Sequence, residues 1–204
     1  MTRSELASEQ QCNERLVALW DEVAERHFPA FRTGEVTFQE QRRRRMREFL
    51  PHVGLAAEDM SDADLDRRFE AYLKHYEAAW RAYDDVLPSL KSLSGTRLAV
   101  LSNGDQAQQE EKLRRTGLDV HFEVVMTSSG LGAEKPSPVA FHLAYARLRV
   151  DPATVMYVGD CLDVDAQAAT AAGLVGVWLD RQDRSGPASQ PTIATQEELP
   201  RLIG

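Results

Sequence analysis

The stretch 155–165 constrains the fold of this chain more than any other part of the sequence. It opens with a short apolar run that predicts a buried strand, and this strand ends at Gly159. Asp160, Asp163 and Asp165 follow in quick succession, and an alanine-rich helix begins directly after them. In parallel α/β sheets, ligands and functional residues gather at the carboxyl ends of the strands. The stretch therefore predicts an α/β fold with carboxylates at a strand end.

These aspartates allow two interpretations. Carboxylates gathered at a strand end bind a hard cation such as Mg²⁺, which prefers oxygen ligands and keeps several of its waters. The plainer interpretation is an acidic loop whose aspartates only cap the next helix. Three acids exceed what one helix cap needs, so we favour the metal site.

From residue 84 onward the chain alternates between apolar strands and helices. Strands are predicted at 96–101, 122–126, 155–158 and 174–179, with a helix or helix-bearing loop between each pair. Such alternation predicts a Rossmann-like, doubly wound parallel sheet.

Residues 1–83 contain no convincing strand and predict an N-terminal helical lobe. The first helix is expected to break at Pro29 and again at Thr33 and Gly34. Thr37 and Ser61 have the pattern of N-caps that open a second and a third helix. We therefore expect two domains, a helical one over 1–83 and an α/β one over 84–204.

Charge and composition exclude several classes of partner. A net charge of −8 argues against nucleic-acid binding, which depends on phosphate neutralisation by lysine and arginine. The only basic run, Arg42–Arg45 with Arg47, is either a solvated helix face or a source of contacts to an anionic substrate. No run reaches the length of a membrane span, there is no signal-peptide pattern, and the two cysteines form no disulfide framework. We therefore expect a cytoplasmic location without membrane or nucleic-acid partners.

Two further features fall at strand ends or in the loops beyond them. Ser102, Asn103 and Gly104 follow the strand 96–101, and Lys135 precedes Pro136 in a loop. A hydroxyl and an amide, together with the N–H groups of a helix start, can hold phosphoryl oxygens. A lysine supplies the positive charge that phosphoryl transfer requires. Each feature alone is weak, but together with the acids they predict a phosphoryl site.

These three features, in this order, resemble the motifs of the haloacid dehalogenase-like (HAD) hydrolases. The strand ending in Ser102 resembles motif II, Lys135 resembles motif III, and Asp160 with Asp165 resembles motif IV. The resemblance implies that Ser102, Asn103, Gly104 and Lys135 bind the phosphoryl group and that Asp160 and Asp165 hold Mg²⁺. Ser102, Lys135 and Asp160 would be the catalytic residues among them. Residues 1–83 resemble the helical cap of one subgroup of the family.

The family's motif I, an Asp-x-Asp at the end of a first strand, is missing from this sequence. Asp62 and Asp64 have the spacing but open an amphipathic helix, and Asp163 with Asp165 belongs to motif IV. The chain thus reads as though it began inside the cap. Without the activated carboxylate we expect no native-like turnover. In the family the first strand lies between the strands of motifs II and IV, so its absence also predicts two open edges or a rearranged or partnered sheet.

The sequence leaves three hypotheses for function. The leading one is a Mg²⁺-dependent phosphatase of a small phosphorylated metabolite, inactive in this chain as written. The second is a non-catalytic descendant that binds a phosphorylated ligand or a protein. The third, a metal-free 2-haloacid dehalogenase, is disfavoured by the retention of Asp160 and Asp165. The substrate and the oligomeric state do not follow from the sequence.

Overall fold

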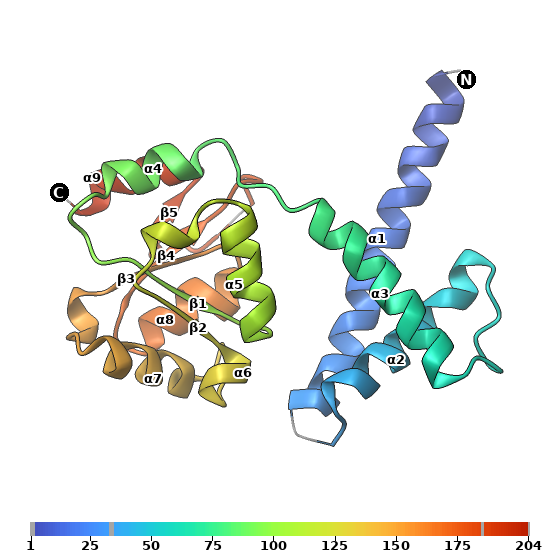
Figure 1. The fold of residues 1–204 in the computed structure, drawn as a ribbon. Helices are drawn as coiled ribbons and strands as arrows, with labels where there is room; N and C mark the ends of the chain where they lie inside the picture. The colour runs from blue at the N-terminus through green and yellow to red at the C-terminus, as the bar shows by residue number, and fades with distance from the viewer. Residues whose placement is uncertain (1–2, 33–34, 185, 204) are drawn as a thin grey trace. The chain divides into compact units, whose positions relative to one another are not determined.

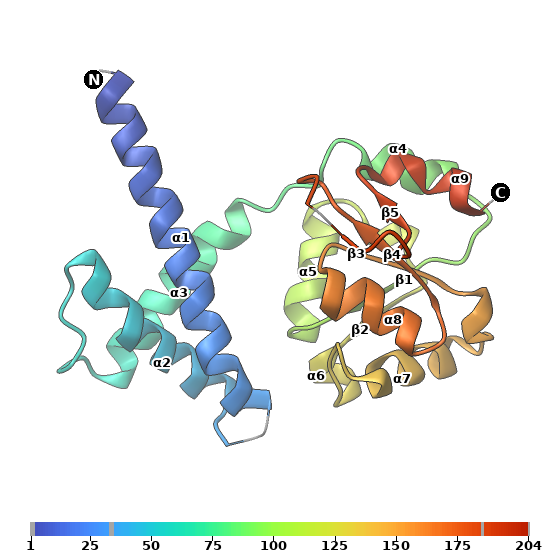
Figure 2. The same cartoon turned by 180° about the vertical axis from the view of Figure 1, so that it is seen from behind.

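The computed structural model describes residues 3–32, 35–184 and 186–203, and the chain divides into two compact units (Figure 1). The first unit is Met1–Ala79 and consists of helices. The second is Trp80–Gly204 and contains all the strands of the described residues (Figure 2). Among these residues no helix is both long enough and apolar enough to span a membrane.

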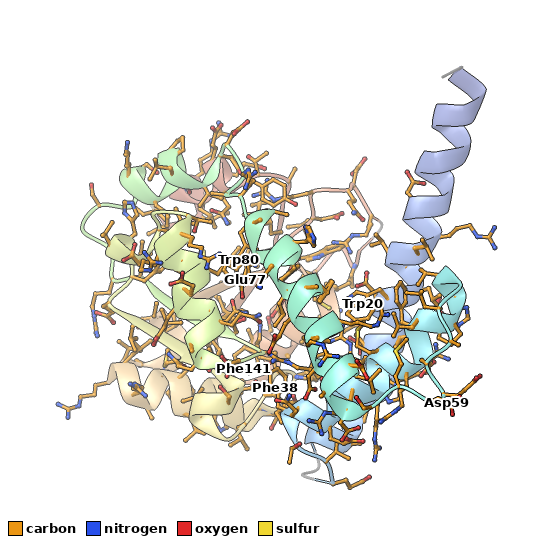
Figure 3. All side chains as sticks on the ribbon, turned by 45° about the vertical axis from the view of Figure 1, so that its right-hand side comes forward. Trp20, Phe38, Asp59, Glu77, Trp80 and Phe141 are labelled. Atoms are coloured by element: carbon orange, nitrogen blue, oxygen red, sulfur yellow. The ribbon has the colours of Figure 1, made fainter. Side chains whose placement is uncertain are left out.

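The helical unit is built from three helices around one apolar cluster. Helix α1 covers Arg3–Arg32, α2 covers Phe38–Phe49 and continues as a 3₁₀ turn, Leu50–Val53, and α3 covers Asp62–Ala78. The cluster draws on α2, α3 and the segment between them, with Trp20 of α1 packed against it (Figure 3). Its buried members are Met46, Leu50, Ala57, Leu65 and Phe69.

Helices α2 and α3 begin where the sequence predicts. The Thr37 hydroxyl accepts a hydrogen bond from the Glu40 N–H at 3.1 Å, and the Ser61 hydroxyl accepts one from the Asp64 N–H at 3.2 Å. These bonds satisfy N–H groups that have no partner inside the helix.

The break expected in the first helix at Pro29 is wrong, because α1 continues through this proline to Arg32. A proline removes one backbone hydrogen bond and crowds the carbonyl four residues earlier. Only three residues of α1 follow Pro29, so the disturbance is confined to the end of the helix. The side chain of Phe31 packs on Phe38, with 5.0 Å between the ring centroids, and holds that turn in place. Thr33 and Gly34 lie outside the described residues.

The second unit has the α/β alternation that the sequence predicts, with parallel strands. In chain order it contains α4 (Val86–Ser92), β1 (Ala99–Ser102), α5 (Gln106–Arg115), β2 (Val124–Thr127), α6 (Ser128–Leu131), α7 (Pro138–Leu148), β3 (Met156–Gly159), a π-helix (Leu162–Gln167), α8 (Ala168–Ala171), β4 (Val175–Leu179), β5 (Thr192–Ile193) and α9 (Pro200–Ile203). Short 3₁₀ turns cover Asp119–His121, Pro152–Thr154 and Gln196–Glu198. The last of these opens with a capping box at Thr195.

The strands form two parallel sheets where the alternation alone predicts one. β1 pairs with β2, and β3, β4 and β5 pair in that order, but β1 and β3 share no backbone pairing. The strand that ends in Ser102 and the strand that ends in Gly159 therefore belong to separate sheets. All residues of β1 and β3 are only half-buried, whereas Val177 of β4 is completely buried.

Side chains still join the two sheets although their backbones do not pair. On one face, Leu98 packs in the same apolar cluster as Met156 and Val158. On the other, Leu101 shares a cluster with Tyr157, beneath the buried ring of Phe141. Successive side chains of a strand point to opposite faces, so each strand contributes to both clusters. Side-chain packing thus replaces the missing ladder.

We predict that the strands of this unit differ in the rate of hydrogen exchange of their backbone amides. β4 is paired on both sides, whereas β1 and β3 each have one edge without a strand partner. Amides on those edges should exchange at least about tenfold faster than the amides of residues 177–179, since unpaired N–H groups open without breaking a ladder. Mass spectrometry or NMR of the monomer measures this. Equally strong protection of 98–101, 155–158 and 177–179 would argue against open edges.

Candidate functional site

The residues predicted for the site come from the ends of β1 and β3 and from the loop between α6 and α7. Ser102 is the last residue of β1, and Gly159 is the last residue of β3. Lys135 lies in the loop that follows α6. Direct hydrogen bonds join these segments, so the structure brings Lys135, Asn103 and Asp165 together.

Asn103 fixes the loop that carries Lys135. Its side-chain amide donates to the Lys135 carbonyl at 2.8 Å and its amide oxygen accepts from the Lys135 N–H at 2.9 Å. Both polar atoms of the Asn103 side chain are engaged in this way. In this structure the side chain therefore positions Lys135, although the sequence suggested it as a phosphoryl ligand.

Lys135 and Asp165 form a buried ion pair. The Lys135 Nζ lies 2.6 Å from the Asp165 Oδ1, and the two side chains are 10% and 7% exposed. The Tyr157 hydroxyl lies beside both, 2.8 Å from the Lys135 Nζ and 3.2 Å from the Asp165 Oδ1. Burial, and then the Asp165 charge, raise the pKa of Tyr157 far above its ordinary value, so the hydroxyl keeps its proton. It also lies 3.0 Å from the Leu101 carbonyl of β1, which it can reach as a donor.

Gly159 allows Asp165 to occupy this place. A Cβ atom at Gly159 would lie 2.3 Å from the Asp165 Cβ, so any side chain there would expel the carboxylate. The π-helix completes the turn: the Asp165 N–H donates to the Cys161 carbonyl at 2.8 Å, and the Cys161 N–H donates to the Asp165 Oδ2 at 3.1 Å. Single π-turns are rare and often occur at functional sites.

Asp160 is held by its backbone while its carboxylate stays exposed. Its carbonyl accepts from the Trp178 Nε1 at 3.2 Å and from the Arg184 Nη2 at 3.1 Å. Among the described residues, the Asp160 carboxylate accepts no hydrogen bond and forms no ion pair. The carboxylate of Asp163 is likewise exposed and without a partner in this part of the chain.

These donors fit a magnesium ion with few protein ligands. Mg²⁺ is commonly bound by one or two carboxylates, with waters and substrate phosphate completing its shell. Asp160 offers a carboxylate of this kind, whereas Asp165 is shared with Lys135. The described residues contain no cluster of three or more histidine, cysteine, aspartate or glutamate side chains that could enclose a metal. A site here would therefore depend on waters and ligand oxygens.

Ser102 and Gly104 differ in how free their polar groups are. The Ser102 hydroxyl makes only one long contact, 3.4 Å to the Asn103 carbonyl, so it remains available to a ligand. The Gly104 N–H already donates to the Ser128 hydroxyl at 2.9 Å. Its φ of 148° favours glycine, so Gly104 shapes the turn after β1.

The sequence did not reveal several residues around the site. Tyr157 reads as an ordinary aromatic residue in a strand, and Ser128 and Arg184 lie in unremarkable polar segments. Asp180 had a usable signal, because an acid directly follows the apolar run of β4. It is 4% exposed, and its Oδ1 accepts from the Arg184 Nε at 2.8 Å.

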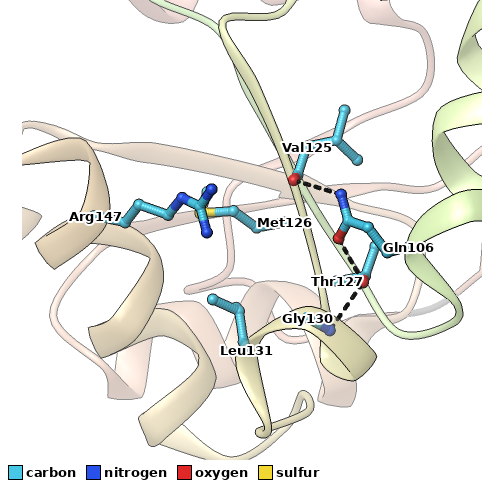
Figure 4. A pocket seen from close by; sticks show the side chains of 7 residues that line it. All are labelled: Gln106, Val125, Met126, Thr127, Gly130, Leu131 and Arg147. Atoms are coloured by element: carbon cyan, nitrogen blue, oxygen red, sulfur yellow. Dashed lines mark hydrogen bonds between the residues drawn. The ribbon is translucent and has the colours of Figure 1, made fainter.

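A separate pocket lies beside β2 (Figure 4). It has a volume of about 280 Å³, and the guanidinium of Arg147 and the amide of Gln106 reach it. The Gln106 amide donates to the Val125 carbonyl at 3.0 Å and accepts from the Thr127 hydroxyl at 2.8 Å. None of the residues that line it belongs to the predicted phosphoryl site.

The three Asp-x-Asp pairs of the sequence are all engaged elsewhere. Two of them, Asp62 with Asp64 and Asp64 with Asp66, lie in α3. There Asp62 pairs with two arginines of α2, Asp64 with Arg67 and Asp66 with Arg43. The third pair, Asp163 and Asp165, lies in the π-helix. Among the described residues, no pair resembles an attacking carboxylate at the end of a first strand.

Comparison with known proteins identifies related sequences. The family model of the haloacid dehalogenase-like hydrolases matches residues 5–173. Glyceraldehyde 3-phosphate phosphatase of Methanopyrus kandleri is 41% identical over 118 residues, which make up 57% of this chain and 47% of that protein. N-acylneuraminate-9-phosphatase of Homo sapiens is 32% identical over 126 residues, or 59% of this chain and 51% of that protein. The chain thus spans about half the length of the curated relatives it matches.

Solved structures share the fold. The magnesium-bound HAD-hydrolase YfnB of Bacillus subtilis is 22% identical, with a TM-score of 0.73 over 93% of this chain and 82% of that chain. L-2-haloacid dehalogenase of Xanthobacter autotrophicus is 20% identical, with a TM-score of 0.75 over 93% of this chain and 86% of that chain. At these identities the likeness concerns the fold alone.

The buried ion pair gives a stability prediction. Replacing Lys135 by Met leaves Asp165 buried without its counter-ion, so the free energy of unfolding should fall by about 3–5 kcal/mol. The double variant Lys135→Met/Asp165→Leu should recover most of that loss, because it removes both charges. Urea unfolding followed by circular dichroism measures both values. The control Lys91→Met, at an exposed lysine of the same unit, should change stability by less than about 0.5 kcal/mol. A double variant no more stable than Lys135→Met would contradict this account.

Proposed function

Because the chain belongs to the haloacid dehalogenase-like hydrolases, we propose that it carries the phosphoryl- and Mg²⁺-binding groups of a phosphatase that acts on a small phosphorylated metabolite. These 204 residues alone are expected to have no native-like turnover. In this proposal residues 84–204 form the catalytic core, and the helical residues 1–83 form the cap. The phosphatases of Methanopyrus kandleri and Homo sapiens support it through their names and identities. The magnesium in the YfnB structure supports the choice of metal.

The observation that carries the proposal is the charge balance at the strand ends. Asp165 already neutralises Lys135, and the exposed carboxylate of Asp160 adds a negative charge nearby. A phosphate monoester is itself an anion, so this arrangement repels it unless a cation is also present. A divalent ion held by Asp160 supplies that charge and polarises the phosphoryl oxygens. A metal-free reaction would have no use for the unpaired Asp160.

Each residue of the site then has a distinct task. The Ser102 hydroxyl donates to a phosphoryl oxygen, and the Lys135 ammonium balances the charge that develops during transfer. Asp165 and Tyr157 hold the Lys135 Nζ in place, and Asn103 holds its backbone. Asp160, and Asp165 through its remaining lone pairs, are the candidate metal ligands.

A non-catalytic ligand-binding protein is the second candidate. One observation favours it: the three Asp-x-Asp pairs of the described residues are all engaged, two in α3 and one in the π-helix. Covalent phosphoryl transfer needs an attacking carboxylate, and none of the described residues occupies that place. The third hypothesis, a metal-free 2-haloacid dehalogenase, is less favoured. Release of halide from 2-haloacids without Mg²⁺ would support it.

We predict that binding of phosphate to this chain depends on Mg²⁺ and on Asp160. Phosphate and Mg²⁺ together should raise the melting temperature more than the sum of their separate effects, because each favours the other's binding. Asp160→Ala should abolish this synergy, whereas Asp163→Ala, at an equally exposed carboxylate three residues away, should retain it. Differential scanning fluorimetry measures the shifts. If both variants lose the synergy equally, it comes from the overall negative charge of this segment and not from a site at Asp160.

We also predict that these 204 residues do not hydrolyse a generic aryl phosphate at a native-like rate, with or without Mg²⁺. The attacking carboxylate is missing from the described residues. Ser102, Lys135 and Asp160 can bind the phosphoryl group and the metal ion and balance their charges, but they supply no nucleophile. A chromogenic assay of the chain beside its Asp160→Ala variant tests this. Turnover that the substitution abolishes would mean that another carboxylate of this chain acts as the nucleophile.

A further inference from the structure

The arginines of α2 differ in how their charges are balanced. Arg43 lies 2.8 Å from the Asp62 Oδ2 and 2.6 Å from the Asp66 Oδ2. Two others are also paired, Arg44 with Glu40 at 3.2 Å and Arg47 with Asp62 at 2.6 Å. These three arginines form a solvated face whose charges are neutralised. For them, the interpretation of the basic run as a solvated helix face holds. Arg45 does not belong to this face.

Arg45 is buried without a counter-ion. It is 8% exposed, and its guanidinium carbon lies 4.2 Å from the Trp20 ring centroid and 5.7 Å from that of Phe69. Its Nε has no hydrogen-bond partner, and no carboxylate among the described residues forms an ion pair with it. Asp21 acts on it only through space. Burial lowers the pKa of Arg45, yet a guanidinium stays charged in proteins.

Gln41 adds a second unsatisfied group one helical turn before Arg45. It is 0% exposed, and neither its Oε1 nor its Nε2 has a hydrogen-bond partner. Residues four apart on a helix lie on the same face, so Gln41 and Arg45 are neighbours there. A buried polar atom without a partner is uncommon in folded proteins and points to an absent water or ligand.

Hydrogen-bond donors outnumber acceptors in this region. The Trp20 Nε1 donates to the Tyr72 hydroxyl oxygen at 2.9 Å, and the charge of Arg45 acts on the same hydroxyl. Tyr72 keeps its own hydroxyl hydrogen as a further donor. The aromatic rings stabilise the cation, but they accept no conventional hydrogen bond. The charge of Asp21 acts on this region, but Asp21 forms no ion pair with Arg45.

We propose that Arg45 and Gln41, with the Tyr72 hydroxyl, form an anion-binding site inside the helical unit. Its ligand is the carboxylate or phosphate group of a small organic anion. The Arg45 fork and the Tyr72 O–H donate to the anionic oxygens, and the Gln41 amide pairs with a polar group next to them. This site goes beyond the proposed phosphatase function, because it shares no residue with the strand-end site.

The test observes the two sites separately in the same protein. Each indole N–H gives its own ¹H–¹⁵N signal: Trp20 lies against Arg45, whereas Trp178 is hydrogen-bonded to Asp160. Inorganic phosphate and malonate are titrated into the whole chain without Mg²⁺. The proposal expects the Trp20 indole signal and the Gln41 amide signals to shift in a saturable manner with at least one of the two anions. A shift with malonate alone assigns a carboxylate, and a shift with phosphate alone assigns a phosphate.

Variants separate specific binding from general charge effects. Arg45→Met should weaken the apparent affinity at the Trp20 signal at least about tenfold, since it removes the charge that selects the anion. Arg44→Met, which removes the neighbouring exposed charge, should leave it within about twofold, because exposed ion-paired charges contribute little. Lys91→Met, at an exposed lysine of the other unit, should leave the Trp20 response unchanged. A Trp178 signal that does not move when phosphate and Mg²⁺ are added together would count against the proposed function and not against this site.

Thermal stability distinguishes a binding role from a structural one. In buffer without polyvalent anions, Arg45→Met should melt at the same temperature as the unchanged chain or higher, because a buried charge without a partner disfavours folding. If Arg45→Met melts at a lower temperature than the unchanged chain, Arg45 has a structural role in the core, and this would contradict the proposal. A Trp20 signal that responds to neither anion, or responds equally in Arg45→Met, would overturn the proposal. If Arg45→Met does not fold, the proposal is overturned as well, and Gln41→Leu should then show whether the amide alone is structural.

Discussion

The buried ion pair between Lys135 and Asp165 is the interaction on which the α/β unit depends. The two side chains are almost completely enclosed, so each would be strongly destabilising without the other. Asp165 reaches its place only because Gly159 has no side chain. Lys135 reaches its place because Asn103, 32 residues earlier, holds both its N–H and its carbonyl group. One pair thus ties the end of β1, the loop after α6 and the end of β3 together.

This connection matters because the strands themselves do not provide it. β1 and β3 share no backbone pairing, and an unsatisfied buried N–H or C=O group costs on the order of 1–3 kcal/mol. Two features reduce that cost. The strands are only half-buried, so water reaches part of their edges. The Tyr157 hydroxyl lies within hydrogen-bond distance of the Leu101 carbonyl, which gives that acceptor a partner from the other sheet. The same hydroxyl contacts Lys135, so the open edge and the site are physically linked.

What the sequence predicts well here depends on short distances along the chain. The caps at Thr37, Ser61 and Thr195 were predictable because each involves a side chain and an N–H group three residues later. Strands β1 to β4 were predictable from apolar runs that end in glycine or polar residues, whereas the two-residue β5 was not predicted. The contacts of Tyr157 and the hold of Asn103 on Lys135 were not, because the partners Lys135 and Leu101 lie 22 to 56 residues away and the two residue types are ordinary for a strand and a turn. The helix break predicted at Pro29 was wrong because the rule that proline ends a helix takes no account of the packing of Phe31 on Phe38.

The two units bury positive charge in different ways, and the difference determines which ligand each can accept. Lys135 has an internal counter-ion, so an anion that approaches it competes with Asp165 and meets Asp160 as well. Such a site favours an anion accompanied by a divalent cation. Arg45 has rings and a hydroxyl around it but no carboxylate paired with it in the described residues. A site of that kind favours an anion alone, because any accompanying cation would meet the arginine's own charge.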